Sequence, residues 1–141
     1  LACAGLVRLG QGDRIRERLG AEVCLPAIGQ GAIGVECRAD DERVNALIAV
    51  LDHPVTHVCV SAERALNARL EGGCQVPIAA HATLDGERLH LDALVGRPDG
   101  SEVIRVSGDA APADAVPLGI RLAEDLLARG ADAILAEVYA G

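Results

Sequence analysis

Two strands and a tight turn are encoded by residues 76–95, VPIAAHATLDGERLHLDALV. The pair Asp85-Gly86 is a typical two-residue hairpin turn, and it separates strand candidates at residues 76–83 and 88–95. A further candidate at residues 102–107 follows a short link rich in turn residues. Strands joined by such short loops run antiparallel. The sequence therefore predicts a three-stranded antiparallel sheet.

Helices are predicted on both sides of these strands in the sequence. Pro54 suits the first turn of a helix, apolar residues then recur at helical spacing, and the glycine pair at 72–73 ends the run. Leucines four residues apart predict a second long helix, which opens at Asp114 or at Pro117 and stops at Gly130. Residues 131–139 favour a short helix. We therefore predict an α+β unit over residues 54–141, with helices covering one face of the sheet.

Residues 1–53 form a separate segment, which reads as helix, strand, crossover, strand and helix. Strands are predicted over residues 23–25 and 33–37, the second because apolar and polar residues alternate there. Asp40 is the candidate cap of the helix that follows. Because this incomplete α/β segment cannot complete a sheet by itself, we expect it to expose apolar surface and to self-associate.

Composition restricts the classes of partner. The formal net charge is −8, which argues against a nucleic-acid surface, because phosphate binding requires clustered Lys and Arg. Five cysteines occur without a CxxC pair, so we expect neither a disulfide framework nor a metal site, and a cytoplasmic location is the expectation. No apolar run reaches the length of about 18 residues that a membrane span needs.

Cys74 differs from the other four cysteines, which read as small buried residues. It lies in LEGGCQVP, residues 70–77, where Glu71 and Gln75 are polar and two glycines let the backbone approach a ligand closely. A hydrolase-type nucleophile is poorly supported, because no histidine is adjacent and the end of the preceding helix disfavours a thiolate. We interpret Cys74 as a thiol to which a group is attached.

Three blocks of the chain, in one register, resemble the porphobilinogen deaminase family. They are ERALNARLEGGCQVPI at 63–78, LPAIGQGAIGVECR at 25–38 and ILAEVY at 134–139. The resemblance implies that residues 54–141 are the third, cofactor-attachment domain of a three-domain enzyme. It implies that residues 1–53 are a remnant of domain 2 with the crossover to domain 1. Because the sequence contains no methionine, we expect a carboxyl-terminal fragment.

The resemblance also implies the activity of this family. Its enzymes are transferases that join four porphobilinogen units into the linear tetrapyrrole hydroxymethylbilane, on the route to haem. The resemblance implies that Cys74 carries a dipyrromethane primer through a thioether. It also implies that Arg38, Arg64 and, less strongly, Arg8 bind the carboxylates of the primer and the growing oligopyrrole.

The resemblance assigns no catalytic residue to this chain. The family's catalytic aspartate has no matching position here, so the fragment alone is expected to be inactive and to lack the primer. We expect the parent enzyme to be monomeric, with neither a nucleic acid nor a membrane as partner.

Two other interpretations stay open from the residues themselves. Residues 54–141 are also compatible with an independent small-molecule-binding or regulatory module, because fold alone does not fix function. The glycine crossover at residues 29–31 lacks both the GxGxxG spacing and the Walker lysine of phosphate loops. It is either a plain structural turn or, by resemblance, a hinge between domains.

Overall fold

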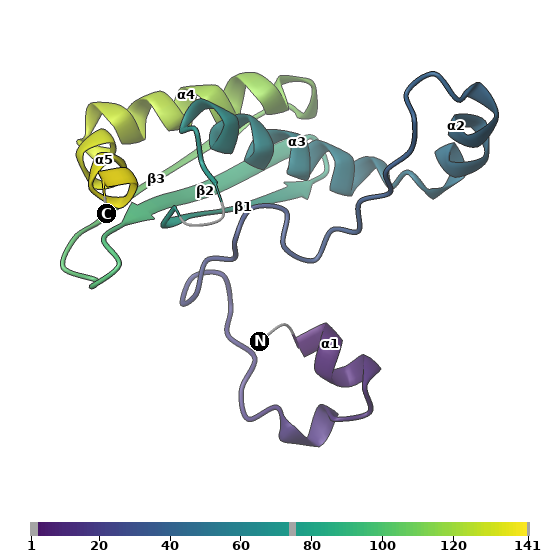
Figure 1. Ribbon diagram of the computed structural model, residues 1–141, viewed down its shortest axis with the longest axis horizontal. Coiled ribbons are helices and arrows are strands. Elements are labelled where there is room, and N and C mark those ends of the chain that lie inside the picture. The colour runs from purple at the N-terminus through teal and green to yellow at the C-terminus, as the bar shows by residue number, and fades with distance from the viewer. Residues whose placement is uncertain (1–2, 74–75, 141) are drawn as a thin grey trace.

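The computed structural model describes residues 3–73 and 76–140. Three helices come first, three strands follow, and two helices end the chain (Figure 1). The bounds are α1 Cys3–Arg8, α2 Glu42–Ile48, α3 Pro54–Arg69, β1 Ile78–Asp85, β2 Arg88–Gly96, β3 Val103–Ala110, α4 Ala115–Ala128 and α5 Ala131–Ala140. Short 3-10 turns span Gly12–Arg14, Ala49–Leu51 and Pro112–Asp114.

The three strands form one antiparallel sheet in the order β1-β2-β3, which confirms the predicted sheet. In the first hairpin Asp85 pairs with Arg88, and Gly86 takes a φ of +56° in the turn between them. Glycine adopts this left-handed conformation without steric cost. β1 begins at Ile78, two residues later than predicted, because Pro77 has no N–H to donate to a ladder.

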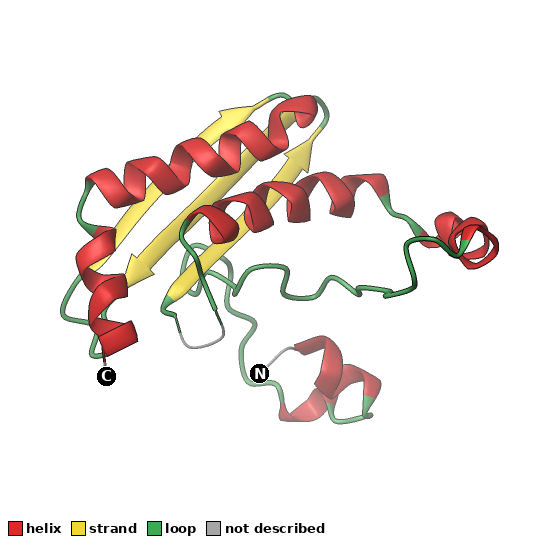
Figure 2. Cartoon of the chain, turned by 45° about the horizontal axis from the view of Figure 1, so that its top comes forward, coloured by secondary structure: helices red, strands yellow, loops and turns green. Residues whose placement is uncertain are grey.

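Helices α3 and α4 lie side by side over one face of the sheet (Figure 2). Buried positions alternate along β2, where Leu89, Leu91, Ala93 and Val95 belong to the core. The positions between them, such as His90, are only half-buried. This period-two pattern is typical of an antiparallel sheet with one covered face. The predicted α+β architecture of residues 54–141 is confirmed.

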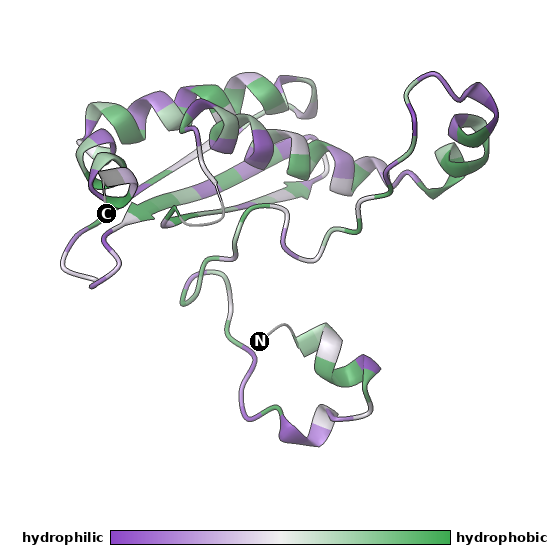
Figure 3. Ribbon diagram, viewed as in Figure 1, coloured by the Kyte–Doolittle hydropathy of each residue, from purple (hydrophilic) through white to green (hydrophobic). Residues whose placement is uncertain are grey.

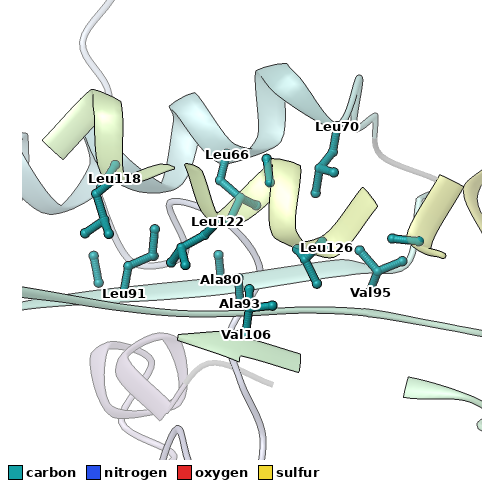
Figure 4. Close-up of a cluster of buried hydrophobic side chains, with 14 of the residues drawn as sticks. Leu66, Leu70, Ala80, Leu91, Ala93, Val95, Val106, Leu118, Leu122 and Leu126 are labelled. Atoms are coloured by element: carbon teal, nitrogen blue, oxygen red, sulfur yellow. The ribbon is translucent and has the colours of Figure 1, made fainter. Parts of the chain in front are cut away.

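The hydrophobic core fills the space between the sheet and the two long helices (Figure 4). It contains Leu66 and Leu70 from α3 and the leucine stripe Leu118, Leu122 and Leu126 from α4. Each fully buried leucine contributes about 1.5–3 kcal/mol relative to an exposed one. The buried side chains of the described residues are aliphatic apart from Glu63, so packing of Ala, Val, Leu and Ile holds this unit together.

Gly119 allows α3 and α4 to approach closely. A Cβ atom at this position would lie 2.2 Å from the carbonyl oxygen of Ala62 and 2.9 Å from the Cβ of Ala65. Neither neighbour can move away alone, because one is backbone and the other is a short side chain on the facing helix. The absence of a side chain at Gly119 therefore sets the distance between the two helices.

The two short strands predicted in residues 1–53 were wrong. Residues 23–25 lie at a turn and bend, and residues 33–37 form no ladder. A strand needs a partner for its N–H and C=O groups, and all strands of the described sheet lie between residues 78 and 110. The predicted helix cap is displaced by one position. Asp41, rather than Asp40, accepts a hydrogen bond from the amide of Val44 at 3.0 Å.

Residues 3–53 expose apolar side chains, as predicted. None of the side chains in this segment is buried, and Figure 3 shows hydrophobic residues on α1 and α2, away from the sheet. The exposed fraction reaches 91% at Ile33 and 83% at Val50. Apolar surface of this kind is typical of an interface, and self-association stays a prediction.

Within residues 3–73 and 76–140 no single helix has the length and hydropathy of a membrane span. The pair Glu42–Leu51 and Pro54–Arg69 meets those criteria only when taken together, and it is bent by 104°.

Candidate functional site

The loop after α3 begins with a well-defined helix end. Leu70 is the C-cap residue, the amide of Glu71 donates to the carbonyl of Ala68 at 3.2 Å, and the amide of Gly72 donates to the carbonyl of Asn67 at 3.0 Å. These two bonds form a Schellman motif, which satisfies the last carbonyl groups of a helix. The helix end therefore fixes the direction in which the chain enters the glycine loop.

Gly72 is held against α3 and Gly73 is not. The side-chain amide of Asn67 donates to the carbonyl oxygen of Gly72 at 3.1 Å. A Cβ at Gly72 would lie 2.1 Å from Asn67 Oδ1 and 2.9 Å from the Cδ1 of Ile78, whereas a Cβ at Gly73 would meet no atom within 4 Å. The loop is thus closely packed at its first glycine and open at its second.

The predicted attachment residue, Cys74, lies outside the described residues, together with Gln75. The described residues on either side of them are joined directly, because the amide of Val76 donates to the carbonyl of Gly73 at 3.2 Å. The segment that contains Cys74 therefore starts and ends at positions fixed by α3 and by the start of β1.

Arg64 borders a cleft of about 630 Å³ beside the amino-terminal part of α3. The crossover residues 31–35 form one wall of this cleft, and the α3 side chains His57, Ser61 and Arg64 form another. Among the described residues Arg64 makes no ion pair, whereas Arg69, one and a half turns later, binds Glu124 at 2.6 Å. The guanidinium of Arg64 is therefore available to an anionic group from outside this chain.

The structure does not bring the other two predicted arginines to this cleft. Arg38 is 83% exposed and lies 3.5 Å from the carboxylate of Asp41. Arg8 is exposed in the last turn of α1. Figures 1 and 2 show α1 and α2 apart from each other, towards the two ends of the segment that connects them. Of the three arginines, only Arg64 lines the cleft.

Glu63, which the sequence interpretation did not select, joins the crossover to the sheet. Its side chain is almost fully buried, with 5% exposure for the residue. One carboxylate oxygen accepts a hydrogen bond from the amide of Gly29 at 2.7 Å, and the other accepts one from the amide of Ala82 at 2.8 Å. A buried carboxylate must be hydrogen-bonded in this way to be tolerated. The available signal was a glutamate four residues after Cys59, on the apolar side of the helix.

The crossover also covers the free edge of β1. The amide of Ala80 donates to the carbonyl of Pro26 at 3.1 Å, and Ile28 packs partly against the core. Together with the bond from Ala82 to Glu63, these contacts use the outward-facing amides of an edge strand. Covered edges are protected from pairing with other chains. Residues 26–29 are thus attached to β1 at Pro26 and to α3 at Gly29, while residues 31–35 line the cleft.

Electrostatics near Glu63 do not favour a reactive cysteine on α3. Burial, and then the negative charge of Glu63, raise the pKa of the Cys59 thiol. Deprotonation of this thiol is therefore disfavoured, and thiolates are the nucleophilic form of cysteine. In the part of the chain that the structure describes, no group of three or more His, Cys, Asp or Glu side chains could hold a metal ion.

Two family models match the chain, and both describe porphobilinogen deaminase. Residues 1–46 match the dipyrromethane cofactor-binding domain, and residues 57–128 match the carboxyl-terminal domain. The second match alone covers the three strands, all of α4 and most of α3. The chain therefore belongs to the porphobilinogen deaminase family. Members of this family are transferases, hydroxymethylbilane synthases, which use porphobilinogen as substrate and a dipyrromethane cofactor in tetrapyrrole biosynthesis.

The described residues fit such a cofactor. A dipyrromethane with acidic side chains needs open space at its point of attachment and cationic groups for its carboxylates. The open position at Gly73 offers the first, and the unpaired Arg64 offers the second. Arg64 lies six residues before Leu70, which corresponds to about 9 Å along a helix axis.

Proposed function

We propose that this chain supplies the primer-carrying, carboxyl-terminal part of a hydroxymethylbilane synthase. Cys74 is the residue that forms the thioether to dipyrromethane. The observation that supports this most is the helix end at Leu70 to Gly73, which fixes the entry to the segment containing Cys74 and leaves Gly73 open. A thioether is not hydrolysed under ordinary conditions, so an anchor of this kind survives repeated additions of substrate.

Cys74 acts as a permanent anchor rather than as a nucleophile that turns over. Cys74 comes four residues after Leu70, the C-cap of α3. The carboxyl-terminal end of a helix carries a partial negative charge, which disfavours a thiolate. A turnover nucleophile needs a standing thiolate or an adjacent base, whereas attachment occurs once. When bound, the dipyrromethane supplies the end to which porphobilinogen units are added.

Arg64 binds carboxylates of the primer or of the growing oligopyrrole. Its guanidinium lines the cleft and has no acidic partner among the described residues. Each charge-assisted bond of this type is worth roughly 1.5–3 kcal/mol when shielded from water. Arg8, on α1, and Arg38, four residues before α2, have the same role once these segments pack against other parts of the enzyme. Both are exposed, Arg38 lies 3.5 Å from Asp41, and Arg8 has no ion pair among the described residues.

The chain divides between residues 53 and 54. Pro54 starts α3 with His53 as its N-cap, all buried side chains of the described residues lie after this point, and the two matched ranges end at residue 46 and begin at residue 57. Residues 1–53 contribute a remnant of domain 2 and the crossover to domain 1, and Gly29 to Gly31 serve as a hinge. The proposed location is the cytoplasm. The four cysteines among the described residues form no disulfide bond, in keeping with this location.

Catalytic proton transfer requires a group from another part of the enzyme. None of the acids in residues 1–141 matches the family's catalytic aspartate, so the chain incubated alone with porphobilinogen is expected to form no hydroxymethylbilane. Tetrapyrrole release by this chain alone, measured as uroporphyrinogen after cyclisation, would contradict that assignment.

The function itself is tested by substitution in the complete enzyme. Cys74→Ser is expected to abolish formation of hydroxymethylbilane, because serine forms no thioether. Cys59→Ser is the matched control and is expected to keep activity, because Cys59 lies within α3, away from the loop, and is only partly buried. Equal activity of Cys74→Ser and the parent enzyme would instead favour an independent small-molecule-binding module in residues 54–141.

A further inference from the structure

Tyr139 is the only aromatic residue of the chain, and neither the core nor the proposed primer site uses it. It lies in α5, and its hydroxyl donates a hydrogen bond to the carbonyl oxygen of Glu71 at 2.5 Å. The two residues are 68 positions apart in the sequence. This bond therefore joins the last helix to the loop that follows α3.

Glu71 has a backbone conformation that requires support. Its φ is +55°, and it is the only non-glycine residue with a positive φ among the described residues. It occupies the position after the C-cap of α3, where glycine is usual because a Cβ is strained there. A non-glycine residue persists in this conformation only when surrounding contacts hold it.

Most contacts that hold Glu71 come from α3 itself. The two Schellman bonds and the bond from Asn67 to Gly72 all join residues no more than five positions apart. The bond from Tyr139 is different, because it comes from another helix. It therefore restrains the loop relative to the folded unit rather than relative to α3 alone.

Helix α5 is attached firmly enough to act as that support. Its residues Ile134 and Leu135 are buried in the core, with exposed fractions of 1% and 5%. Leu135 and Tyr139 border a small hollow of about 250 Å³ together with Leu70 and Glu71. The side of α5 that packs on the core is thus continuous with the residue that reaches the loop.

We propose that Tyr139 is a positioning residue for the primer loop, which we define as residues 71–73, the segment that leads to Cys74. By holding the carbonyl of Glu71, it fixes the course of the chain between α3 and the attachment residue. This role rests on the proposed function, because it matters for the reaction only if Cys74 carries the primer. The contact and its effect on the loop exist in either case.

Site-resolved amide hydrogen exchange on residues 1–141 tests the contact. Tyr139→Phe keeps the ring and removes only the hydroxyl. Exchange at the Gly72 amide is expected to rise roughly five-fold, the equivalent of one ordinary hydrogen bond, while exchange at Val106 in β3 stays unchanged. In a Glu71→Gly background the same substitution is expected to raise exchange by less than about two-fold, because glycine adopts a positive φ without support. Unchanged exchange at Gly72, or an equal rise at Val106, would overturn the proposal.

Kinetics of the complete enzyme test the positional role. Tyr139→Phe is expected to lower kcat at least about three-fold, because small displacements of reacting groups are costly, with KM for porphobilinogen unchanged. Adding Glu71→Gly is expected to restore kcat. An unchanged kcat, or a loss that Glu71→Gly does not restore, would overturn the positional role. A failed primer assignment is distinguishable, because Cys74 would then lack an adduct in parent and variant alike.

Discussion

The Glu63 carboxylate and the amide of Gly29 are joined by a hydrogen bond of 2.7 Å across 34 residues of sequence. The other oxygen of the same carboxylate accepts the amide of Ala82 at 2.8 Å. One buried side chain therefore holds the glycine crossover and the edge of β1 together. This bridge also holds the crossover beside the cleft, because residues 31–35, which line the cleft, follow closely after Gly29. Arg64, the residue after Glu63, lines the same cleft from α3.

Removing the charge of Glu63 should release the crossover. In Glu63→Gln only one side-chain oxygen remains as acceptor, so one of the two amides faces an NH₂ group instead. The free energy of unfolding in urea is expected to fall by about 1–3 kcal/mol, the cost of leaving a buried polar group unsatisfied. Glu124→Gln, which breaks the exposed pair with Arg69, is the control and is expected to cost at most about 1 kcal/mol. Equal effects of the two substitutions would show that Glu63 is no more than a surface charge.

The close approach of α3 and α4 makes Gly119 intolerant of a side chain. Gly119→Ala places a Cβ 2.2 Å from the carbonyl oxygen of Ala62, so the two helices must separate and the core must repack. A loss of at least about 2–3 kcal/mol is expected, measured by thermal or urea unfolding. Gly5→Ala in α1 is the matched control, because a Cβ there meets no atom within 4 Å. A Gly119→Ala variant as stable as the Gly5→Ala variant contradicts the packing described.

Acid should remove one stabilising interaction on the open face of the sheet. Hydrogen bonds from Arg88 and then His90 lower the pKa of Asp109 from its usual 3.8 to about 2. A carboxylate with a lowered pKa in the folded state stabilises the fold above its ordinary pKa, and this contribution disappears as the pH falls through the folded value. The difference in Tm between the parent and Asp109→Asn should therefore shrink as the pH falls from about 4 to about 2. A difference that stays the same down to pH 2 would exclude the ion pair as its cause.

Exposed apolar residues before α3 should make the chain self-associate. Among the residues that the structure describes, Ile33 and Val50 have the most exposed large apolar side chains, at 91% and 83%. Sedimentation velocity of residues 1–141 is expected to show a mass that rises with concentration, and the double substitution Ile33→Ser/Val50→Ser should weaken that rise. Val116→Ser on α4 is the control, because its side chain is exposed on the sheet-and-helix unit. A parent chain that stays monomeric at every concentration would refute this expectation.

The fold of residues 54–141 could be predicted because its signals are local and its partners lie within the same segment. The turn at Asp85-Gly86, the helix start at Pro54 and the leucine spacing of α4 each specify an element, and those elements cover one another. The strand predicted over residues 33–37 is absent for the opposite reason. Alternation specifies which side chains share a face, but it does not supply a neighbouring strand.

Candidate site residues could be selected from the sequence only where the residue type itself suggests a role, as the charge of an arginine suggests carboxylate binding. Arg64 was selected from its residue type and lines a cleft, and its binding of carboxylates stays a prediction. Glu63 and Tyr139 were not selected, because their roles depend on contacts across 34 and 68 residues of sequence. Burial of a glutamate, or the reach of a tyrosine hydroxyl to a loop, follows from tertiary packing and has no local pattern.

We propose Cys74 as the permanent anchor of the primer. Intact mass of the complete enzyme, purified from cells that make porphobilinogen, measures this directly. We predict an added mass equal to one dipyrromethane, located on Cys74 by peptide mapping, absent in Cys74→Ser and retained in Cys59→Ser. An active enzyme whose mass equals that of the bare polypeptide would show that the reaction needs no primer anchored on Cys74.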